Sequence, residues 1–461
     1  MSLLLCILVI VSSFQFSLGF RGHYLFHDEI PPGDDVGEPL FLTSYIEEGR
    51  IEEGRKASEV NVSDVASYAG FFTVNKRYNS NLFFWYFPAE IEPDKAPVLL
   101  WLQGGPGASS LNGLFNENGP FYLDKDLVLH KRKTSWSMVF NLIYIDNPVG
   151  TGFSFTENHK GYARDEIQVG KDLYAALYQF FTLFPHLQKK EFFISGESYA
   201  GKYVPAVGHT IHTRNRNSSL KINLKGLAMG DGWTDPERML DYGDYLYQLG
   251  LIDSNDRRLF LDGQQKALEY VRKGDYIKAK NVVDTLVSDF NPHGTLYYNL
   301  TGLESCYNYV INDDRGKYGD LSKFLQSDEL RRALHVGNMT FQNGYYSSKY
   351  LENDVMQSVK PWIEELLEEY RILFYNGQLD IICAYPLTLN VLQHLKWSGA
   401  TQYKSEPRKH WYVDGELAGY SKTVKGMTEV LVRNSGHIVP NDQPEWALDM
   451  IIRFVFNKPF N

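Results

Sequence analysis

Cysteine is scarce in this sequence. The 461 residues include only three cysteines, Cys6, Cys306 and Cys383, and Cys6 lies in an apolar stretch at the N-terminus. A chain of this length can bury a large core, so it does not need the disulfide framework on which small secreted domains depend. Cys306 and Cys383 could form one bridge or stay free, and the sequence leaves both possibilities open.

Positive charge is outnumbered by negative charge. Lysine and arginine total 46, aspartate and glutamate total 56, and the formal net charge is −10 at pH 7. Proteins whose main partner is nucleic acid carry basic patches instead. The charge balance therefore argues against nucleic acid as a partner.

Long apolar runs are absent from the chain after its N-terminal segment. No run there reaches the roughly 18 residues that a membrane helix needs. The N-terminal run, residues 3–11, is shorter than that and is followed by the small residues of Ser17-Leu18-Gly19. This arrangement predicts a signal peptide at 1–19. The run has no lysine or arginine before it, which leaves a buried first strand as the alternative.

Four Asn-x-Ser/Thr sequons agree with passage through the secretory pathway. They lie at Asn61, Asn217, Asn299 and Asn338. Each sequon alone is a common chance match, but together with the N-terminal segment they predict a glycoprotein that is secreted or lysosomal.

Spacings typical of zinc peptidases are also missing. None of the 12 histidines begins a His-Glu-x-x-His or a His-x-x-Glu pattern, which are the helical arrangements that bind catalytic zinc. His209 and His212 share one face of an expected helix, but such pairs are more often surface residues. The sequence predicts chemistry without a metal or an organic cofactor.

What the sequence does contain is an alternation of apolar, β-rich runs with helical patterns. Several runs are continuous, as expected for strands buried on both faces of a sheet. Between two of them Leu173, Leu177, Phe180 and Phe184 recur at helical spacing. The expected strands are Tyr68–Val74, Leu82–Phe87, Val98–Leu102, Met138–Ile145, Phe192–Ile194, Leu224–Met229, Ile372–Tyr375 and Thr428–Val432. This pattern predicts an α/β fold with helices on both sides of the sheet.

The alternation is interrupted at 233–336, where the sequence is mostly helical and more charged. We expect this segment to be a helical cap inserted into the sheet domain. The domain would then be built from two parts, 20–232 and 337–461.

A strand that runs into a tight serine turn provides the first candidate for catalysis. Residues 192–201 read Phe-Phe-Ile-Ser-Gly-Glu-Ser-Tyr-Ala-Gly, with small residues two positions either side of Ser198. In the nucleophile elbow of α/β-hydrolases, such neighbours allow a strained backbone that exposes the serine oxygen. Ala200 replaces the last glycine of the usual Gly-x-Ser-x-Gly pattern. Because a serine in a glycine-rich turn is often only a turn, the motif needs partners.

Two further strands end close to residues that could activate Ser198. A serine hydroxyl becomes a good nucleophile when an imidazole takes its proton and a carboxylate orients that imidazole. Asp380 follows the strand at 372–375, and His437 follows the strand at 428–432. The order Ser, Asp, His is that of α/β-hydrolases, whose sites lie at the carboxyl ends of strands. Each residue alone could be a cap or a loop residue, but together they predict a catalytic triad.

A glycine-rich loop, Gln103-Gly104-Gly105-Pro106-Gly107, follows the expected strand at 98–102. Glycines allow backbone N–H groups to point into a pocket without obstruction by side chains. Acyl transfer needs such donors at the developing oxyanion, each worth roughly 100- to 1000-fold in rate. We predict that the N–H groups of Gly105 and Tyr199 form this oxyanion hole, although the loop in isolation would be read as a turn.

With these segments in place, the chain resembles the serine carboxypeptidase family over nearly its whole mature length, and within it the vitellogenic-like and venom enzymes. The segments that carry the resemblance are Trp101–Ser110, Asp146–Ser154, Gly196–Pro205, Asn376–Asp380 and Gly436–Pro440. The resemblance implies an α/β-hydrolase core with a helical insertion. It also implies hydrolysis of the last peptide bond of peptides and proteins.

The resemblance further implies how a free C-terminus is recognised. The residues at the positions that bind the substrate carboxylate in the family are Gln103, Gly104, Glu197 and Glu117. Gln103 replaces the usual asparagine and adds one methylene, and Ala108 replaces a cysteine, so any disulfide made there is absent. Adjacent carboxylates repel one another, so at least one glutamate should hold a proton. This predicts peptide binding that is tighter at acidic pH.

Two alternative functions remain open from the residues alone. An acyltransferase or esterase would use the same triad and pass its acyl group to an alcohol. A secreted binding or storage protein could keep the scaffold without activity, although the presence of all three triad residues argues against this.

Overall fold

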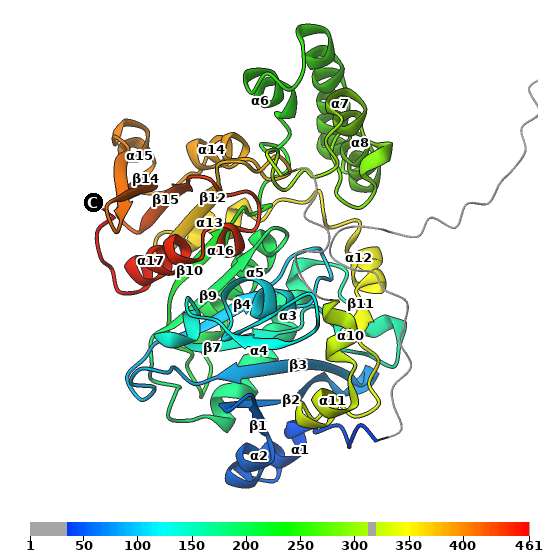
Figure 1. Cartoon of the computed structure of the whole chain (residues 1–461), viewed down its shortest axis with the longest axis vertical. Coiled ribbons are helices and arrows are strands. Elements are labelled where there is room, and N and C mark those ends of the chain that lie inside the picture. Colours follow the sequence, from blue (N-terminus) through cyan, green and yellow to red (C-terminus); the bar gives the residue numbers. More distant parts are fainter. Residues whose placement is uncertain (1–34, 312–319, 461) are drawn as a thin grey trace, which may run out of the picture.

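An 11-stranded sheet runs through the computed structural model, which describes residues 35–311 and 320–460. Its strand order is β1-β2-β3-β7-β4-β9-β10-β12-β15-β14-β13 (Figure 1). The strands are β1 (Glu59–Val62), β2 (Val65–Asn75), β3 (Ser80–Phe87), β4 (Val98–Leu102), β7 (Asn141–Ile145), β9 (Phe192–Glu197), β10 (Leu224–Gly230), β12 (Arg371–Gly377), β13 (Lys409–Val413), β14 (Glu416–Val424) and β15 (Met427–Val432). Two short ladders pair β5 (Phe121–Leu123) with β6 (Leu129–Lys131), and β8 (Thr151–Gly152) with β11 (Gln342–Asn343).

The middle of the sheet is parallel. β7, β4, β9, β10, β12 and β15 run in one direction, and the remaining strands pair antiparallel at the two edges. Each run expected to be a strand coincides with or overlaps a strand of this sheet. β13 and β14 were not predicted, because their partly exposed residues give no continuous apolar run.

The parallel strands are buried on both faces. On β9, Phe192 and Ile194 belong to the core on one side of the sheet and Phe193 to the core on the other. On β4, Leu100 belongs to the first of these cores and Trp101 to the second. Successive side chains of a strand point to opposite faces, so burial of both faces requires the continuous apolar runs seen in the sequence.

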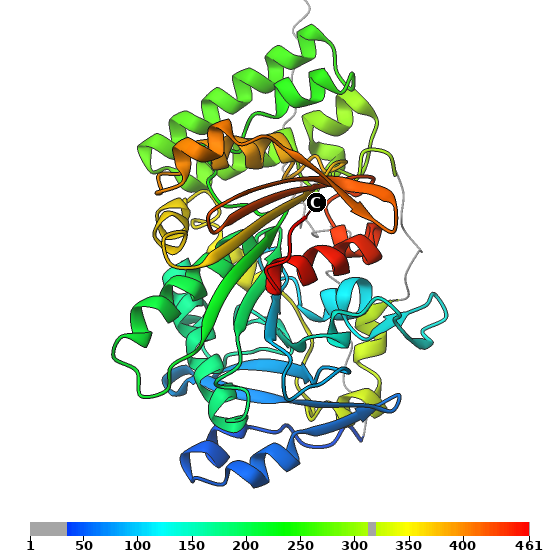
Figure 2. The same ribbon diagram turned by 90° about the vertical axis from the view of Figure 1, so that its left-hand side faces the viewer.

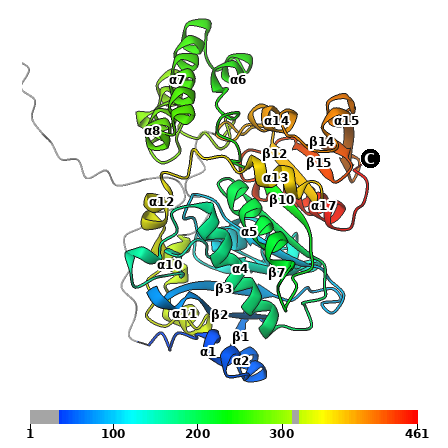
Figure 3. The same cartoon turned by 180° about the vertical axis from the view of Figure 1, so that it is seen from behind.

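Helices cover both faces of the sheet. α4 (Glu166–Leu183), α5 (Ala200–Asn215) and α13 (Lys360–Leu366) lie on one face (Figure 3), and α17 (Pro444–Val455) lies on the other (Figures 1 and 2). The remaining helices outside the cap region are α1 (Leu42–Glu47), α2 (Ile51–Ala57), α3 (Leu111–Gly113), α14 (Tyr385–Gln393), α15 (Ala400–Ser405) and α16 (Val439–Asp442). This arrangement confirms the prediction of a sheet with helices on both sides.

Helix α4 shows how the local sequence fixes an element. Its first turn is capped by Asp165, whose side chain accepts a hydrogen bond of 2.8 Å from the N–H of Gln168. Leu173, Leu177 and Phe180 are buried on the face that packs against the sheet, as their spacing predicted.

Between β10 and β12 the chain is mostly helical. Its helices before α13 are α6 (Tyr242–Gln248), α7 (Ser254–Lys273), α8 (Tyr276–Leu286), α9 (Leu296–Thr301), α10 (Leu321–Leu325), α11 (Asp328–Ala333) and α12 (Tyr345–Leu351). α6, α7 and α8 project from one end of the molecule, whereas α11 lies beside β1 near the other end (Figures 1 and 3). The boundaries of the cap at 233 and 336 therefore stay a prediction.

Several sequence-based predictions concern single segments. The expected signal peptide at 1–19 lies outside the described residues, and so does Cys6. Cys306 and Cys383 are buried free thiols, so the possible bridge between them is not formed. The four sequon asparagines are all exposed. In residues 35–311 and 320–460, no helix has both the length and the apolarity needed to cross a bilayer.

Candidate active site

The turn after β9 holds Ser198 in a strained conformation at the carboxyl edge of the parallel strands. Its φ is +61°, in the left-handed region that residues with a side chain rarely adopt. The N–H of Ser198 donates to the carbonyl of Gly230 at 2.9 Å, and its own carbonyl accepts from the N–H groups of Gly201 and Trp233 at 2.9 Å each. These hydrogen bonds hold the serine half-exposed at the start of α5.

Small neighbours make this turn possible. A Cβ on Gly196 would lie 2.5 Å from the carbonyl oxygen of Leu102 and 2.7 Å from the Cβ of Ala200. A Cβ on Gly201 would lie 2.7 Å from the Cα of Gly232. Ala200 fits at the position of the usual last glycine because Gly196 leaves room for its methyl group.

His437 and Asp380 meet beside this turn. Nδ1 of His437 lies 2.9 Å from Oδ2 of Asp380, and both side chains are buried. Asp380 also accepts hydrogen bonds from the N–H groups of Ile382 at 2.9 Å and Cys383 at 3.2 Å. The ring of Tyr307 stacks on the imidazole with centroids 4.5 Å apart. The histidine is therefore fixed in orientation, with Nε2 directed away from the aspartate.

Ser198 and His437 line the same cavity, but the hydrogen bond between them is not made. Nε2 of His437 is buried and has no hydrogen-bond partner among the described residues. Catalytic hydrogen bonds are often long in the absence of substrate and tighten when it binds. Rotation of the Ser198 side chain about its single χ1 torsion moves the hydroxyl without any change in the backbone.

The glycine-rich loop packs directly against the serine turn. A Cβ on Gly104 would lie 2.5 Å from the backbone nitrogen of Tyr199 and 2.8 Å from the Cβ of Ser198. Gly105 has a φ of +110°, which only glycine adopts readily. The loop therefore lies against the amide of Tyr199 and lines the same cavities as Ser198. That the N–H groups of Gly105 and Tyr199 form an oxyanion hole stays a prediction.

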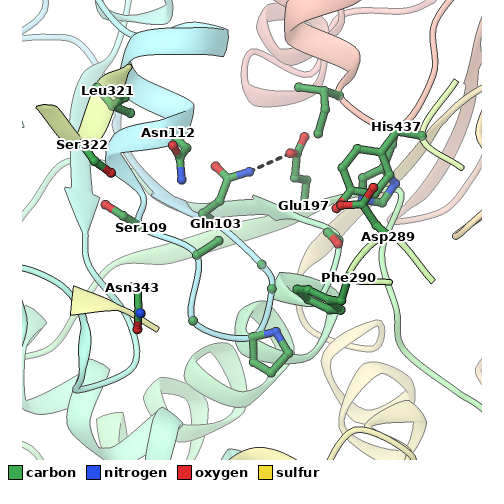
Figure 4. A pocket seen from close by; sticks show the side chains of 18 of the residues that line it. Gln103, Ser109, Asn112, Glu197, Asp289, Phe290, Leu321, Ser322, Asn343 and His437 are labelled. Atoms are coloured by element: carbon green, nitrogen blue, oxygen red, sulfur yellow. Dashed lines mark hydrogen bonds between the residues drawn. The ribbon is translucent and has the colours of Figure 1, made fainter. Parts of the chain in front are cut away.

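Gln103, Glu197 and Glu117 form a buried polar cluster beside the serine. Figure 4 shows Gln103 and Glu197. Nε2 of Gln103 donates to Oε1 of Glu197 at 2.7 Å, and its Oε1 accepts from the indole N–H of Trp101 at 3.0 Å. Burial raises the pKa of Glu117 to about 7. Burial and then the charge of Glu117 raise the pKa of Glu197 well above its usual value. At mildly acidic pH this carboxyl pair therefore holds protons.

Two cavities meet at Ser198. The first is lined by the glycine loop, Gln103, Glu197 and His437 (Figure 4). The second has a volume of about 300 Å³. Its apolar and aromatic lining includes Trp233, Tyr242, Val283, Val287, Val355 and Ile382. The serine thus has a polar cavity with a carboxyl pair on one side and a larger, more apolar cavity on the other.

Comparison with known proteins assigns this chain to a family. Residues 58–457 match the family model described as Serine carboxypeptidase. This chain belongs to the serine carboxypeptidase family. It is 52% identical over 459 residues to the venom serine carboxypeptidase of Apis mellifera, an alignment that covers 97% of each chain. It is 48% identical over 430 residues to the vitellogenic carboxypeptidase of Aedes aegypti, which covers 92% of this chain and 91% of the relative.

A solved structure establishes the fold of this serine carboxypeptidase. The crystal structure of Kex1(delta)p, a prohormone-processing carboxypeptidase from Saccharomyces cerevisiae, is similar with a TM-score of 0.73. The identity is 24%, and the similarity covers 87% of this chain and 96% of that one. The family match confirms the resemblance found in the sequence, and the similar structure confirms the predicted α/β-hydrolase fold.

In this serine carboxypeptidase, the segment that begins at Asp146 holds the glycine loop in place. Oδ1 of Asp146 accepts from the hydroxyl of Ser109 at 2.5 Å and from the N–H of Ser110 at 3.0 Å. Oδ2 accepts from the N–H of Phe153 at 2.9 Å. Burial raises the pKa of Asp146 to about 6 in spite of these donors. One buried carboxyl therefore connects two loops that are distant in the sequence, next to the glycine loop.

Replacing Gly152 with alanine is expected to lower the free energy of unfolding by about 2–4 kcal/mol. The φ of Gly152 is +54°, and a Cβ there would lie 2.0 Å from Oδ2 of Asp146. Gly250→Ala is the matched control, because Gly250 has a φ of +72° with nothing within 4 Å. The control should cost only about 1 kcal/mol of backbone strain in urea unfolding. Equal losses in the two variants would contradict the proposed contact.

A buried ion pair supports α5 below the serine. Nζ of Lys202 contacts Oδ2 and the backbone carbonyl of Asp354, and both side chains are buried. The hydroxyl of Tyr199 donates to the same carboxylate at 3.1 Å. The first turn of α5 is therefore fastened to the segment that follows α12.

Removing the Asp354 carboxylate with Asp354→Ala is expected to lower the free energy of unfolding by about 3–5 kcal/mol, because Lys202 would remain buried without its counter-charge. Urea unfolding monitored by circular dichroism measures the loss. Asp275→Ala is the control, since it breaks the exposed Lys278–Asp275 pair and should cause no measurable change. A small loss for Asp354→Ala would mean that water or another group replaces the carboxylate.

The structure also places residues in the site that the sequence did not single out. Tyr307 stacks on His437, and its backbone carbonyl accepts the His437 N–H at 2.7 Å. Asp231 lies beside Asp380 at the end of β10. Asp231 could have been found from its position, because it directly follows a parallel strand. Tyr307 could not, because it lies in the helical segment at 233–336 with no pattern around it.

Proposed function

We propose that this serine carboxypeptidase hydrolyses the C-terminal peptide bond of peptides and proteins with Ser198, Asp380 and His437 as its catalytic triad. The observation that carries the proposal is the position of Ser198 between a buried carboxyl pair and a larger apolar cavity, beside the His437–Asp380 pair. A peptide whose last residue lies against the carboxyl pair presents its final peptide bond to the serine.

The reaction is a double displacement. Nε2 of His437 takes the proton of the Ser198 hydroxyl, and the oxygen attacks the carbonyl carbon of the last peptide bond. The N–H groups of Gly105 and Tyr199 donate to the oxyanion, and the protonated imidazole gives its proton to the departing amino acid. A water molecule, deprotonated by His437, then attacks the acyl-enzyme, and the proton returns to Ser198. Asp380 holds the imidazole throughout.

Recognition of the free C-terminus falls to the carboxyl cluster. A protonated Glu197 can donate a hydrogen bond to the terminal carboxylate of the substrate, and Glu117 and Gln103 hold Glu197 in place. The N–H of Gly104 is available in the same cavity. An ionised pair would instead repel the substrate. The enzyme should therefore prefer acidic pH.

A secretory location suits this chemistry. The N-terminal segment 1–19 and the exposed asparagines of the four sequons support a signal peptide, glycosylation and a secreted or lysosomal enzyme. The names of the relatives from Apis mellifera and Aedes aegypti, which refer to venom and vitellogenesis, agree with export.

Release of free amino acid from blocked dipeptides, measured from pH 4 to 8, tests the proposal. Hydrolysis of the dipeptide acid in preference to its C-terminal amide is expected. A serine-directed phosphonate should label Ser198, and peptide mapping identifies the modified residue. Hydrolysis of activated esters without release of amino acids from dipeptides would instead support an esterase or acyltransferase.

A further inference from the structure

Asp231 is a buried acid that the reaction as described does not use. It directly follows β10, has a φ of +42°, and its side chain is fully buried. Its Oδ1 accepts hydrogen bonds from the N–H of Gly377 at 2.9 Å and from Nδ2 of Asn376 at 3.3 Å. Its Oδ2 is buried and has no hydrogen-bond partner among the described residues.

The second carboxyl group beside Asp231 is that of the triad. One carboxylate oxygen of Asp231, one of Asp380 and one ring nitrogen of His437 all lie within 4.8 Å of one another. Both aspartates are completely buried. Two ionised carboxylates this close in a buried site repel strongly, so one of them holds a proton.

The donors around the pair decide which aspartate is ionised. Asp380 accepts from the N–H groups of Ile382 and Cys383 and faces Nδ1 of His437. Hydrogen bonds of this kind favour a charged carboxylate. Asp231 accepts only at Oδ1, and its Oδ2 is free to carry a proton. Burial, followed by the charge of Asp380, raises the pKa of Asp231 well above its usual value.

We propose that Asp231 is a positioning residue of the triad, which stays protonated at working pH and donates a hydrogen bond from Oδ2 to the carboxylate of Asp380. A neutral donor fixes the rotation of the Asp380 carboxylate without neutralising it. The negative charge of Asp380 can then pair with the imidazole of His437. This inference rests on the proposed function, because it assigns a role to a neighbour of the proposed triad. The role goes beyond the Ser198, Asp380 and His437 set.

The surroundings of Asp231 favour the neutral form. The titratable groups that face it from the elements packed around it are Glu197, Tyr245, Tyr375, Asp380, Cys383 and His437. Only His437 among these can carry positive charge, and it pairs with Asp380. Ionisation of Asp231 would place a second negative charge beside the imidazole.

Two substitutions separate the donor from the charge. Asparagine is nearly isosteric with a protonated aspartate, because its Oδ1 can accept from Gly377 while its amide donates to Asp380. We expect Asp231→Asn to keep kcat within about threefold of the wild type. Asp231→Ala removes the donor and is expected to lower kcat by about 10- to 100-fold with KM within about twofold, the range for loss of one hydrogen bond to a charged group.

The pH dependence of phosphonate labelling supplies the decisive readout. The acidic limb of the labelling rate reports ionisation of His437 and does not require recognition of a peptide carboxylate. If Asp231 is neutral, Asp231→Asn leaves this limb within about 0.3 pH unit of the wild type. If Asp231 is ionised, the same change removes a negative charge near the ring and moves the limb to lower pH by about one unit.

Asp172→Asn is the matched control, because Asp172 is a buried acid on α4 outside the active site, with a pKa raised by burial to about 7. It should leave the labelling rate and kcat within twofold of the wild type.

A shift of the acidic limb to lower pH in Asp231→Asn, or a loss of kcat as large as that of Asp231→Ala, would overturn the inference. If Asp231→Ala does not fold, the acidic limb of the labelling rate of Asp231→Asn still tests the inference. An enzyme that is labelled at Ser198 but releases no amino acid contradicts the proposed function instead, and the labelling test of Asp231 stands.

Discussion

Replacing Ser198 with alanine is expected to lower kcat for release of a C-terminal amino acid on the order of 10⁶-fold. The substitution removes the attacking oxygen and leaves the carboxyl cluster intact. The affinity for a blocked dipeptide, measured by calorimetry at acidic pH, should therefore stay within about threefold of the wild-type KM. The two measurements together separate loss of the nucleophile from loss of binding.

Ser405→Ala provides the control for this experiment, because Ser405 is exposed at the end of α15. It should behave as the wild type. If Ser198→Ala kept more than about one per cent of the activity, the nucleophile would have to be a different residue. Loss of both activity and affinity would indicate that the turn had not folded.

The carboxyl pair should give the enzyme a pH-dependent KM. The pKa of Glu117 is raised to about 7 and that of Glu197 well above its usual value, so both groups are neutral in mildly acidic solution. Binding of the substrate carboxylate is then fully present only well below pH 7 and is lost as the pH rises through the raised pKa values. We expect KM for a blocked dipeptide to rise roughly 10- to 100-fold between pH 5 and pH 8, the range for loss of a hydrogen bond to a charged group.

Glu197→Gln isolates this effect. A glutamine keeps a donor and cannot ionise, so KM at pH 5 should change little and its rise towards pH 8 should be much smaller. The C-terminal amide of the same dipeptide serves as the control substrate, because it lacks the carboxylate and should show little pH dependence in KM with either enzyme. An unchanged pH profile and an unchanged preference for the acid over the amide in Glu197→Gln would refute this role of the pair.

Some of the site could be predicted because it is encoded in local patterns. Ser198 is marked by an apolar strand, a turn of small residues and a helix in immediate succession. Asp380 and His437 follow strands that are continuous apolar runs, because burial on both faces demands it. Since parallel strands bring their carboxyl ends to one edge of the sheet, the approximate meeting of these residues follows from their order along the chain.

Other parts depend on distances between segments that are far apart in the chain. No local pattern in the sequence indicates the state of Cys306 and Cys383, the packing of α11 beside β1 or the stacking of Tyr307 on His437. The antiparallel strand β14, which lies beside the edge strand β13, was not predicted because its exposed face allows polar residues at alternate positions.

The sequence by itself determined most strands of the sheet, which serine stands in a tight turn and which aspartate and histidine follow later strands. Only the tertiary structure decided that Glu117 and Glu197, and likewise Asp231 and Asp380, share buried sites. The physical reason is that the protonation of a carboxyl depends on burial and on charges a few ångströms away. Those neighbours come from segments that only the folded chain brings together.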